Sequence, residues 1–210
     1  MNNIDFMFLI IIFITIVLVY YFIEFDNMIY IKSDIDNQMY LVRNTSNRKK
    51  AADMLAQLKK NIFILTEIMY EKTQKLPTKR YIEFAPYILQ LKENIYNVVI
   101  RESSENSVYT SYTINKGKEI VFCIRSKDIA CDIRDNKNKC IKLHDINLIM
   151  YVALHEISHV ACPELQHTEL FKRIFKFICE EAIEAGLYNR IDFSKNHHEC
   201  CGIQITDSII

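Results

Sequence analysis

The sequence predicts an α+β protein in which helices pack on a small, mostly antiparallel sheet, with a transmembrane helix at the N-terminus. Three observations support this prediction. An uncharged apolar run lies near the N-terminus, two regions with apolar residues every three or four positions flank the centre, and the centre is rich in Val, Ile, Tyr and Thr divided by polar turns. With 50% apolar and 25% charged residues, the 210-residue chain fits one globular domain plus an appendage.

The apolar run covers Phe6–Ile23 without a charge and is bracketed by Asp5 and Glu24. About 20 apolar residues cross a bilayer core. A cleaved signal peptide is the alternative interpretation, but its apolar region is usually shorter and follows positive charge, whereas only MNNID precedes this run. We therefore expect residues 1–26 to form an uncleaved anchor and residues 27–45 to form a polar tether.

The positive charges nearest the anchor all follow it, beginning with Lys32 and Arg43. Because Lys and Arg are retained on the cytosolic side, the rest of the chain is expected there, as in a single-pass membrane protein. The sequon at Asn44 matters only if the domain faces a lumen. The zero formal net charge provides no field that attracts nucleic acid, so no nucleic-acid partner is expected.

The seven cysteines are an odd number without a CxxC pair, which favours reduced thiols over a disulfide framework. Two pairs are possible redox exceptions: the adjacent Cys200 and Cys201, and Cys131 with Cys140, which flank a polar turn.

Residues 46–192 are expected to form the folded domain, and residues 193–210 an irregular tail. A first amphipathic helix is predicted from Ser46, a candidate N-cap, to about Lys75, and a shorter one over Ala85–Tyr96. The following strands are expected at Val98–Arg101, Val108–Ile114 and Ile120–Arg125, with a hairpin turn at Asn115–Lys118.

Two more helices are predicted after these strands. Asp145 is suited to cap a helix that runs to about Cys162, where Pro163 ends it. An apolar stripe of period 3.6 then runs from Phe171 to Ala185, with Gly186 as the C-terminal cap.

The helix that ends at Pro163 carries the pattern HExxH. His155 and His159 are four residues apart, so both imidazoles lie on one helix face, near enough to bind one ion. Glu156 lies beside the first imidazole and is suited to act as a general base. Three ionisable groups inside the apolar run Ile146–Ala161 are costly to bury unless something binds them. The pattern therefore predicts one catalytic Zn²⁺ rather than a structural histidine pair.

A catalytic zinc ion takes three protein ligands and leaves a fourth position open. His167 is the first candidate for the third ligand, because Pro163 and the short turn after it can return the chain to the metal at the start of the next helix. The alternative is a carboxylate on that helix, offered by Glu180, Glu181 or Glu184. Glu164 is a weaker option, and spacing alone does not separate these choices.

The stretch HEISHVACPELQHTELF resembles the zincin metallopeptidases of the WLM and SprT-like group, in which a later His in an HxxxF context follows HExxH. The resemblance implies that His155, His159 and His167 bind zinc, that Glu156 is the catalytic base, and that about Ser46–Asp192 forms a compact zincin-like core. The spacing of eight between the second and third His is longer than is usual in WLM members. The tail ECCGIQI resembles the ending of WLM-type proteins from large DNA viruses.

The sequence thus predicts a membrane-anchored zinc metalloendopeptidase that acts on a protein or peptide. We expect the substrate to add as a strand along an open sheet edge, for which Ile120–Arg125 is the first candidate. The alternative is a non-catalytic membrane or virion structural protein whose zincin fold is stabilised by zinc. The resemblance also suggests a protease for DNA-linked proteins, but the anchor argues against that function.

Overall fold

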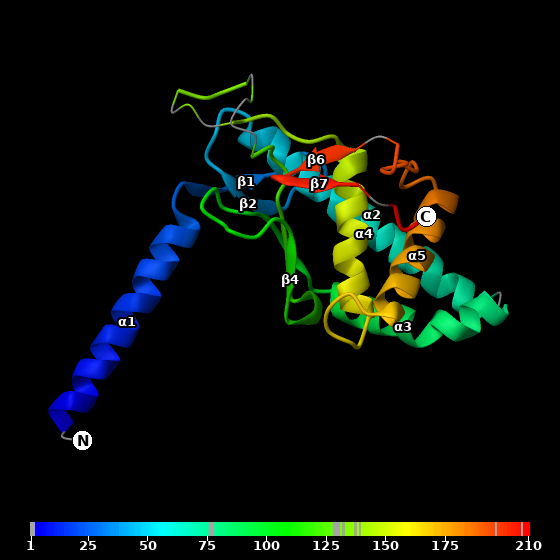
Figure 1. Ribbon diagram of the computed structural model, residues 1–210, viewed down its shortest axis with the longest axis horizontal. Coiled ribbons are helices and arrows are strands. Elements are labelled where there is room, and N and C mark those ends of the chain that lie inside the picture. The colour runs from blue at the N-terminus through cyan, green and yellow to red at the C-terminus, as the bar shows by residue number, and fades with distance from the viewer. Residues whose placement is uncertain are drawn as a thin grey trace.

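The computed structural model describes residues 3–75, 78–127, 131, 133–136, 138, 140–195, 197–206 and 208–210. Helix α1 (Asn3–Phe25) extends away from the other elements (Figure 1). Its apolar window from Asp5 to Phe22 is not buried, and among the described residues it is the one helix long and apolar enough to cross a membrane. A signal sequence near the N-terminus meets the same criterion.

Helices α2 (Arg48–Lys75), α3 (Lys79–Ile95), α4 (Ile146–Ala161) and α5 (Glu169–Glu184) form the body of the protein. Helix α4 contacts the other three (Figure 1). Eleven of its 16 residues are buried, so the helix that carries the HExxH pattern is the central helix of the core.

Two helix starts differ from the prediction. Helix α2 begins at Arg48 rather than Ser46. Helix α3 begins at Lys79 rather than Ala85, because the Thr78 hydroxyl accepts the Tyr81 N–H and caps an earlier turn. Proline usually marks a helix start or break, yet α3 continues through Pro86.

A three-stranded sheet lies beside α4 and has the order β3-β5-β4, where β3 is Val99–Glu102, β4 is Tyr112–Ile114 and β5 is Glu119–Phe122. β5 pairs antiparallel with β4 and parallel with β3. The prediction that Ile120–Arg125 forms an open edge is wrong, because the β5 part of that segment lies between its two neighbours. The edge near α4 is β4 instead.

The prediction of a polar tether at residues 27–45 is also wrong. Strands β1 (Met28–Lys32) and β2 (Met39–Arg43) form an antiparallel hairpin that contacts α2. Tyr40 and Val42 are buried in the core at 2% and 0% exposure. Alternation along β2 directs these side chains inward, although the segment is polar on average.

The described part of the C-terminal tail contains regular structure, although the sequence predicted an irregular segment. β6 (His198–Cys200) and β7 (Ile203–Ile205) form an antiparallel hairpin, and Cys201 in its turn forms a disulfide with Cys123 after β5. Cys131 and Cys140 form a second disulfide. The expectation of reduced thiols is therefore wrong for Cys123 and Cys201, while Cys131 and Cys140 form a pair that was named as an exception. The other named pair, Cys200 with Cys201, does not form, and the buried Cys162, Cys179 and Cys200 remain free.

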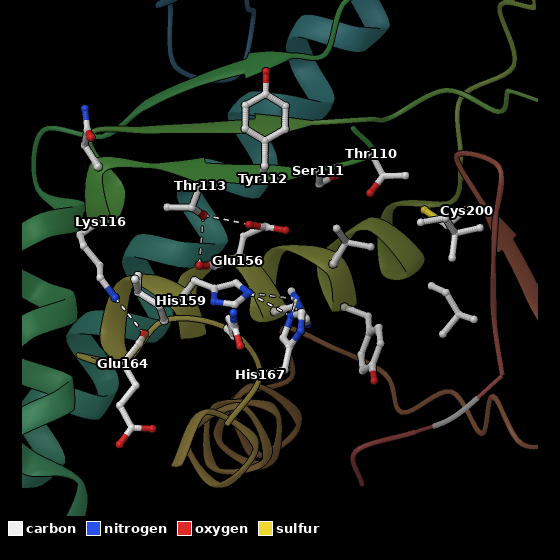
Figure 2. A pocket seen from close by; sticks show the side chains of 18 residues that line it. Thr110, Ser111, Tyr112, Thr113, Lys116, Glu156, His159, Glu164, His167 and Cys200 are labelled. Carbon is white, nitrogen blue, oxygen red and sulfur yellow. Dashed lines mark hydrogen bonds between the residues drawn. The ribbon is translucent and has the colours of Figure 1, made fainter. Parts of the chain in front are cut away.

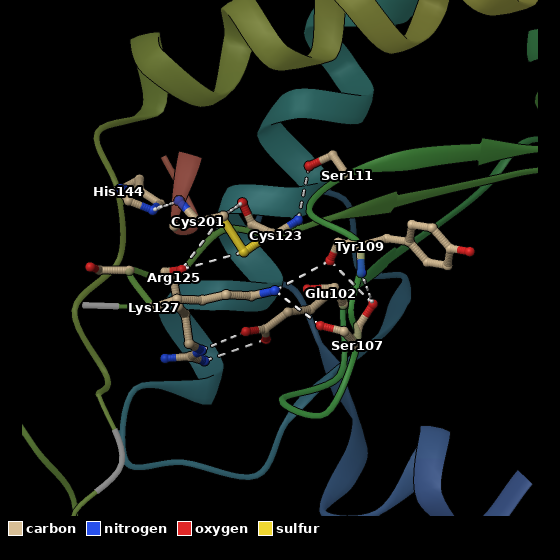
Figure 3. The surroundings of a disulfide bond; sticks show 12 residues. Glu102, Ser107, Tyr109, Ser111, Cys123, Arg125, Lys127, His144 and Cys201 are labelled. Atoms are coloured by element: carbon tan, nitrogen blue, oxygen red, sulfur yellow. Dashed lines mark hydrogen bonds and ion pairs between the residues drawn. A yellow bond between two sulfur atoms is a disulfide. The ribbon is translucent and has the colours of Figure 1, made fainter. Parts of the chain in front are cut away.

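A buried ion pair joins the segments that precede α4. The side chains of Glu102 and Arg125 are both 0% exposed, and Arg125 Nε donates to Glu102 Oε1 at 2.5 Å (Figure 3). Glu102 Oε2 accepts the backbone N–H of Arg43 at 2.9 Å. Arg125 also donates to the side chain of Asn47, directly before α2. One buried ion pair therefore joins four parts of the chain: the N-terminal hairpin, the start of α2, β3 and the segment after β5.

The two disulfides close loops of very different length, with sequence separations of 78 for Cys123–Cys201 and 9 for Cys131–Cys140. Loop-closure entropy predicts a loss of about 4.5 kcal/mol in the free energy of unfolding for the first pair replaced by Ser, and about 2.6 kcal/mol for the second. Denaturant titration of both double variants measures this difference.

Three of the seven cysteines should react with a thiol reagent after unfolding without reductant, because the other four are paired in disulfides. Seven reactive thiols would contradict the pairing.

Candidate metal centre

Helix α4 has the start and the end that the sequence predicted. The Asp145 carboxylate accepts the N–H of Asn147 at 2.8 Å, and the helix ends at Ala161, two residues before Pro163. One turn of α4 carries His155, Glu156 and His159, and all three line the same cavity.

The turn after α4 is held by a residue that the sequence analysis did not single out. The Lys116 ammonium, from the short 3₁₀ turn η1 (Asn115–Gly117), donates to the carbonyl oxygens of Cys162 at 2.7 Å and Glu164 at 3.1 Å (Figure 2). Thr168 then caps α5 by accepting the N–H of Phe171 at 3.3 Å. His167 directly precedes this cap, so its place at the start of the helix is fixed by the turn on one side and by α5 on the other.

The three predicted histidines meet at one point. The Nε2 atoms of His155 and His159 are 3.2 Å apart, those of His159 and His167 are 3.2 Å apart, and those of His167 and His155 are 3.0 Å apart. Nitrogens bound to one tetrahedral zinc ion at about 2.0–2.1 Å lie about 3.3 Å from one another. The donor set and its spacing therefore fit Zn²⁺.

Hydrogen bonding among the rings is a poor alternative explanation. Each neutral ring nitrogen either donates or accepts, so three Nε2 atoms facing one point cannot all pair with one another. Burial, together with the neighbouring imidazoles, lowers the pKa of His155 to about 3; burial, His167 and Lys116 lower that of His159 to about 4. Both rings are thus neutral near pH 7, which is the form that binds metals.

Phe171 contacts all three imidazole rings. Its ring stacks on His159 with centroids 4.2 Å apart and meets His155 and His167 edge-on at 5.1 and 4.9 Å. The Phe171 side chain is 2% exposed. The Phe of the HxxxF pattern therefore packs against all three histidine rings.

Glu156 lies within hydrogen-bonding reach of the edge strand. The Thr113 hydroxyl of β4 donates to Glu156 Oε2 at 2.9 Å and lies 3.3 Å from the Glu156 carbonyl oxygen (Figure 2). Burial raises the pKa of Glu156 to about 7, and the bond from Thr113 opposes that shift. Thr113 was not predicted from the sequence, because its role depends on β4 lying against α4.

The alternative third ligands point elsewhere. Glu180 pairs with Arg80 at 2.6 Å, while Glu181 and Glu184 both pair with Lys72 at 2.8 Å. Glu164 accepts a hydrogen bond from the Thr168 hydroxyl. Of the candidates, only His167 shares a point with the first two histidines.

The three histidines and Glu156 line an open cavity of about 830 Å³ between β4 and α4. Thr113 and Glu156 lie at its centre, with His159 and His167 beside them, and Lys116 and Cys200 mark opposite ends (Figure 2). The remaining lining residues come from β4 and its flanks, α4, the turn after α4, and the C-terminal hairpin: Thr110, Ser111, Tyr112, Asn115, Tyr151, Val152, His155, Glu164, Leu165, Gln166, Ile203 and Ile205.

The fold and the site define an α+β protein with three histidines and one glutamate grouped in an open cavity. The chain is 41% identical over 181 residues to the uncharacterized protein R325 of Acanthamoeba polyphaga mimivirus, covering 86% of this chain and 84% of that protein. It therefore belongs to the same family, a family of viral proteins. Uncharacterized protein 136R of Invertebrate iridescent virus 6 is 28% identical over 76% of this chain and 90% of its own length.

A third relative, uncharacterized protein 042R of Invertebrate iridescent virus 3, is 37% identical over 50% of this chain and 56% of its own length. These relatives support the large DNA virus source that the tail suggested. No family model and no solved structure matches the chain.

Replacing His167 by Ala should raise the dissociation constant for zinc by about 100-fold or more, because losing even a hydrogen-bonding partner of a ligand costs about 10- to 100-fold. Competition with a chromophoric chelator measures the constant. Glu184→Gln is the matched control, since Glu184 is an exposed alternative ligand. Unchanged affinity in His167→Ala, with loss in Glu184→Gln, would contradict the three-histidine site.

Proposed function

We propose that this protein is a membrane-anchored, zinc-dependent metallopeptidase with a zincin-like core. The observation that carries the proposal is the convergence of the His155, His159 and His167 Nε2 atoms within 3.0–3.2 Å of one another, beside Glu156, in one open cavity. The resemblance of HEISHVACPELQHTELF to WLM and SprT-like zincins supports the same reaction class.

His155, His159 and His167 would hold the zinc ion. When bound, the ion would polarise the substrate carbonyl and lower the pKa of a bound water toward neutral pH. Glu156 takes a proton from the attacking water and returns it to the leaving amine, as a general base and then a general acid. The hydrogen bond from Thr113 leaves Glu156 Oε1 available for this transfer and orients the carboxylate. Lys116 holds the turn that delivers His167.

The peptide substrate is proposed to lie along β4. In the described part of the sheet, β4 pairs with β5 on one side, and residues 110–113 line the cavity on the other. An extended peptide can add to such an edge through main-chain hydrogen bonds. Its carbonyl groups would then pass over the Glu156 and histidine cluster.

Glu156→Gln should keep zinc and lower peptide cleavage by about 10²- to 10⁴-fold, since the amide cannot take the proton. Mass spectrometry of a cleaved peptide library and metal analysis of the same samples measure the two properties. Glu93→Gln, an exposed carboxylate on α3, is the matched control. Full cleavage by Glu156→Gln would refute the mechanism, while zinc-loaded protein that cleaves no peptide would favour the structural role.

We also propose that α1 anchors the domain on the side of the membrane that is opposite to the cytosol. The Lys and Arg count predicted the cytosolic side, but two disulfides favour an oxidising compartment. Asn44 is exposed and begins the sequon Asn44-Thr45-Ser46, so it is placed to report the topology.

Translation of the full chain with microsomes should add a glycan at Asn44, seen as a gel shift that an N-glycosidase removes. Asn44→Gln should show no shift. An unmodified chain that added protease digests outside intact microsomes would place the domain on the cytosolic side and overturn this orientation.

A further inference from the structure

The C-terminal hairpin β6-β7 forms one end of the cavity that contains the three histidines. Cys200, Ile203 and Ile205 of this hairpin line the cavity together with Tyr151 and Val152 of α4. The sequence analysis treated this segment as a tail, and the proposed mechanism does not use it. Its position beside the site calls for a role.

The C-terminal hairpin forms the wall at this end of the cavity, and several contacts hold it in place. Cys201 is bonded covalently to Cys123, and its backbone N–H donates to His144 Nε2 at 3.2 Å (Figure 3). The Ser126 hydroxyl donates to Glu199 Oε2 at 3.4 Å. Cys200 and Cys201 are 6% and 3% exposed, so the turn is embedded in the domain rather than loosely attached.

Val152, Ile203 and Ile205 give this end of the cavity apolar side chains, and the hydroxyls of Thr110 and Ser111 lie beside it (Figure 2). Among the charged lining residues, Lys116 and Glu164 lie at the opposite end, away from Cys200 (Figure 2). Ile203 is 54% exposed, while Ile205 packs partly against the core. An exposed isoleucine beside a cavity wall is an apolar surface that a ligand side chain can cover.

The distance from this wall to the reacting groups is short. Tyr151 and Val152 precede His155 by four and three residues, which on a helix is about one turn, or about 5.4 Å. An extended peptide advances about 3.3 Å per residue. A side chain in contact with the wall therefore belongs to a residue within one or two positions of the bond that lies over the histidines.

We propose that the C-terminal hairpin, with Tyr151 and Val152, forms a subsite that selects a bulky apolar side chain, such as Leu or Phe, next to the cleaved peptide bond. This inference rests on the proposed function and adds its substrate class. The Cys123–Cys201 disulfide positions the wall. Covering Ile203 and its neighbours with an apolar side chain removes apolar surface of both partners from water, which strengthens binding of such peptides by about 10- to 100-fold over polar ones.

The test measures binding separately from cleavage. Full-length Glu156→Gln protein, loaded with zinc in detergent micelles, is titrated with fluorescent alanine-based hexapeptides that carry Leu, Phe, Ser or Asp at one scanned position. Leu and Phe peptides are expected to bind about 10- to 100-fold more tightly than Ser or Asp peptides. Wild-type protein with the same peptides then gives the position of the preferred residue relative to the cleaved bond.

The decisive variant is Ile203→Asp, made in the Glu156→Gln background. Because Ile203 is exposed, the change should leave the fold intact and abolish the preference for Leu and Phe. Ile82→Asp is the matched control, since Ile82 is 64% exposed on α3 and does not line the cavity. That variant should retain the preference.

The outcomes separate this inference from the proposed function. Equal affinity for all peptides, binding of none, or a preference that survives Ile203→Asp overturns the subsite. Wild-type cleavage without an apolar preference also overturns it but leaves the peptidase function standing. Selective binding that Ile203→Asp abolishes, with no cleavage by the wild type, supports the subsite and refutes the peptidase.

Discussion

The buried ion pair between Glu102 and Arg125 is the interaction on which the arrangement of this domain most depends. Both side chains are fully buried, and Glu102 also accepts the backbone N–H of Arg43. Removing Glu102 would leave the Arg125 guanidinium buried without this counter-ion, which costs about 3–5 kcal/mol. The pair ties β2 and β3 to the segment after β5, which carries Cys123 and leads toward α4. The sheet edge and the C-terminal hairpin are thereby placed against one central helix.

The candidate site uses that placement through a few contacts between elements. Helix α4 supplies two imidazoles and Glu156, while Lys116 holds the turn that returns His167 to the same point. Thr113 then joins the sheet edge to the carboxylate. The histidines and Glu156 are costly to bury in an apolar helix, and the proposed zinc ion would offset that cost for the three imidazoles. Stability and the proposed chemistry therefore depend on the same few residues.

The N-terminal apolar helix and the viral relatives bear on where this site acts. Helix α1 is long and apolar enough to cross a bilayer, and the chain is similar to proteins of a mimivirus and of an iridescent virus. The disulfide that closes 78 residues fixes the C-terminal hairpin beside the cavity. If α1 anchors the domain as proposed, the proposed peptidase site would act on proteins at the surface of the same membrane.

The sequence by itself determined features that depend on neighbouring residues. Local periodicity and caps defined the helices after Asp145, and the i, i+4 spacing placed His155 and His159 on one face. A proline break and a capped helix start also selected His167 as the first candidate. Only the tertiary structure separated His167 from the glutamates, paired Cys123 with Cys201, and showed that β4 rather than β5 is the edge. Those outcomes depend on contacts between residues far apart in the chain, and a pattern of neighbours carries no information about them.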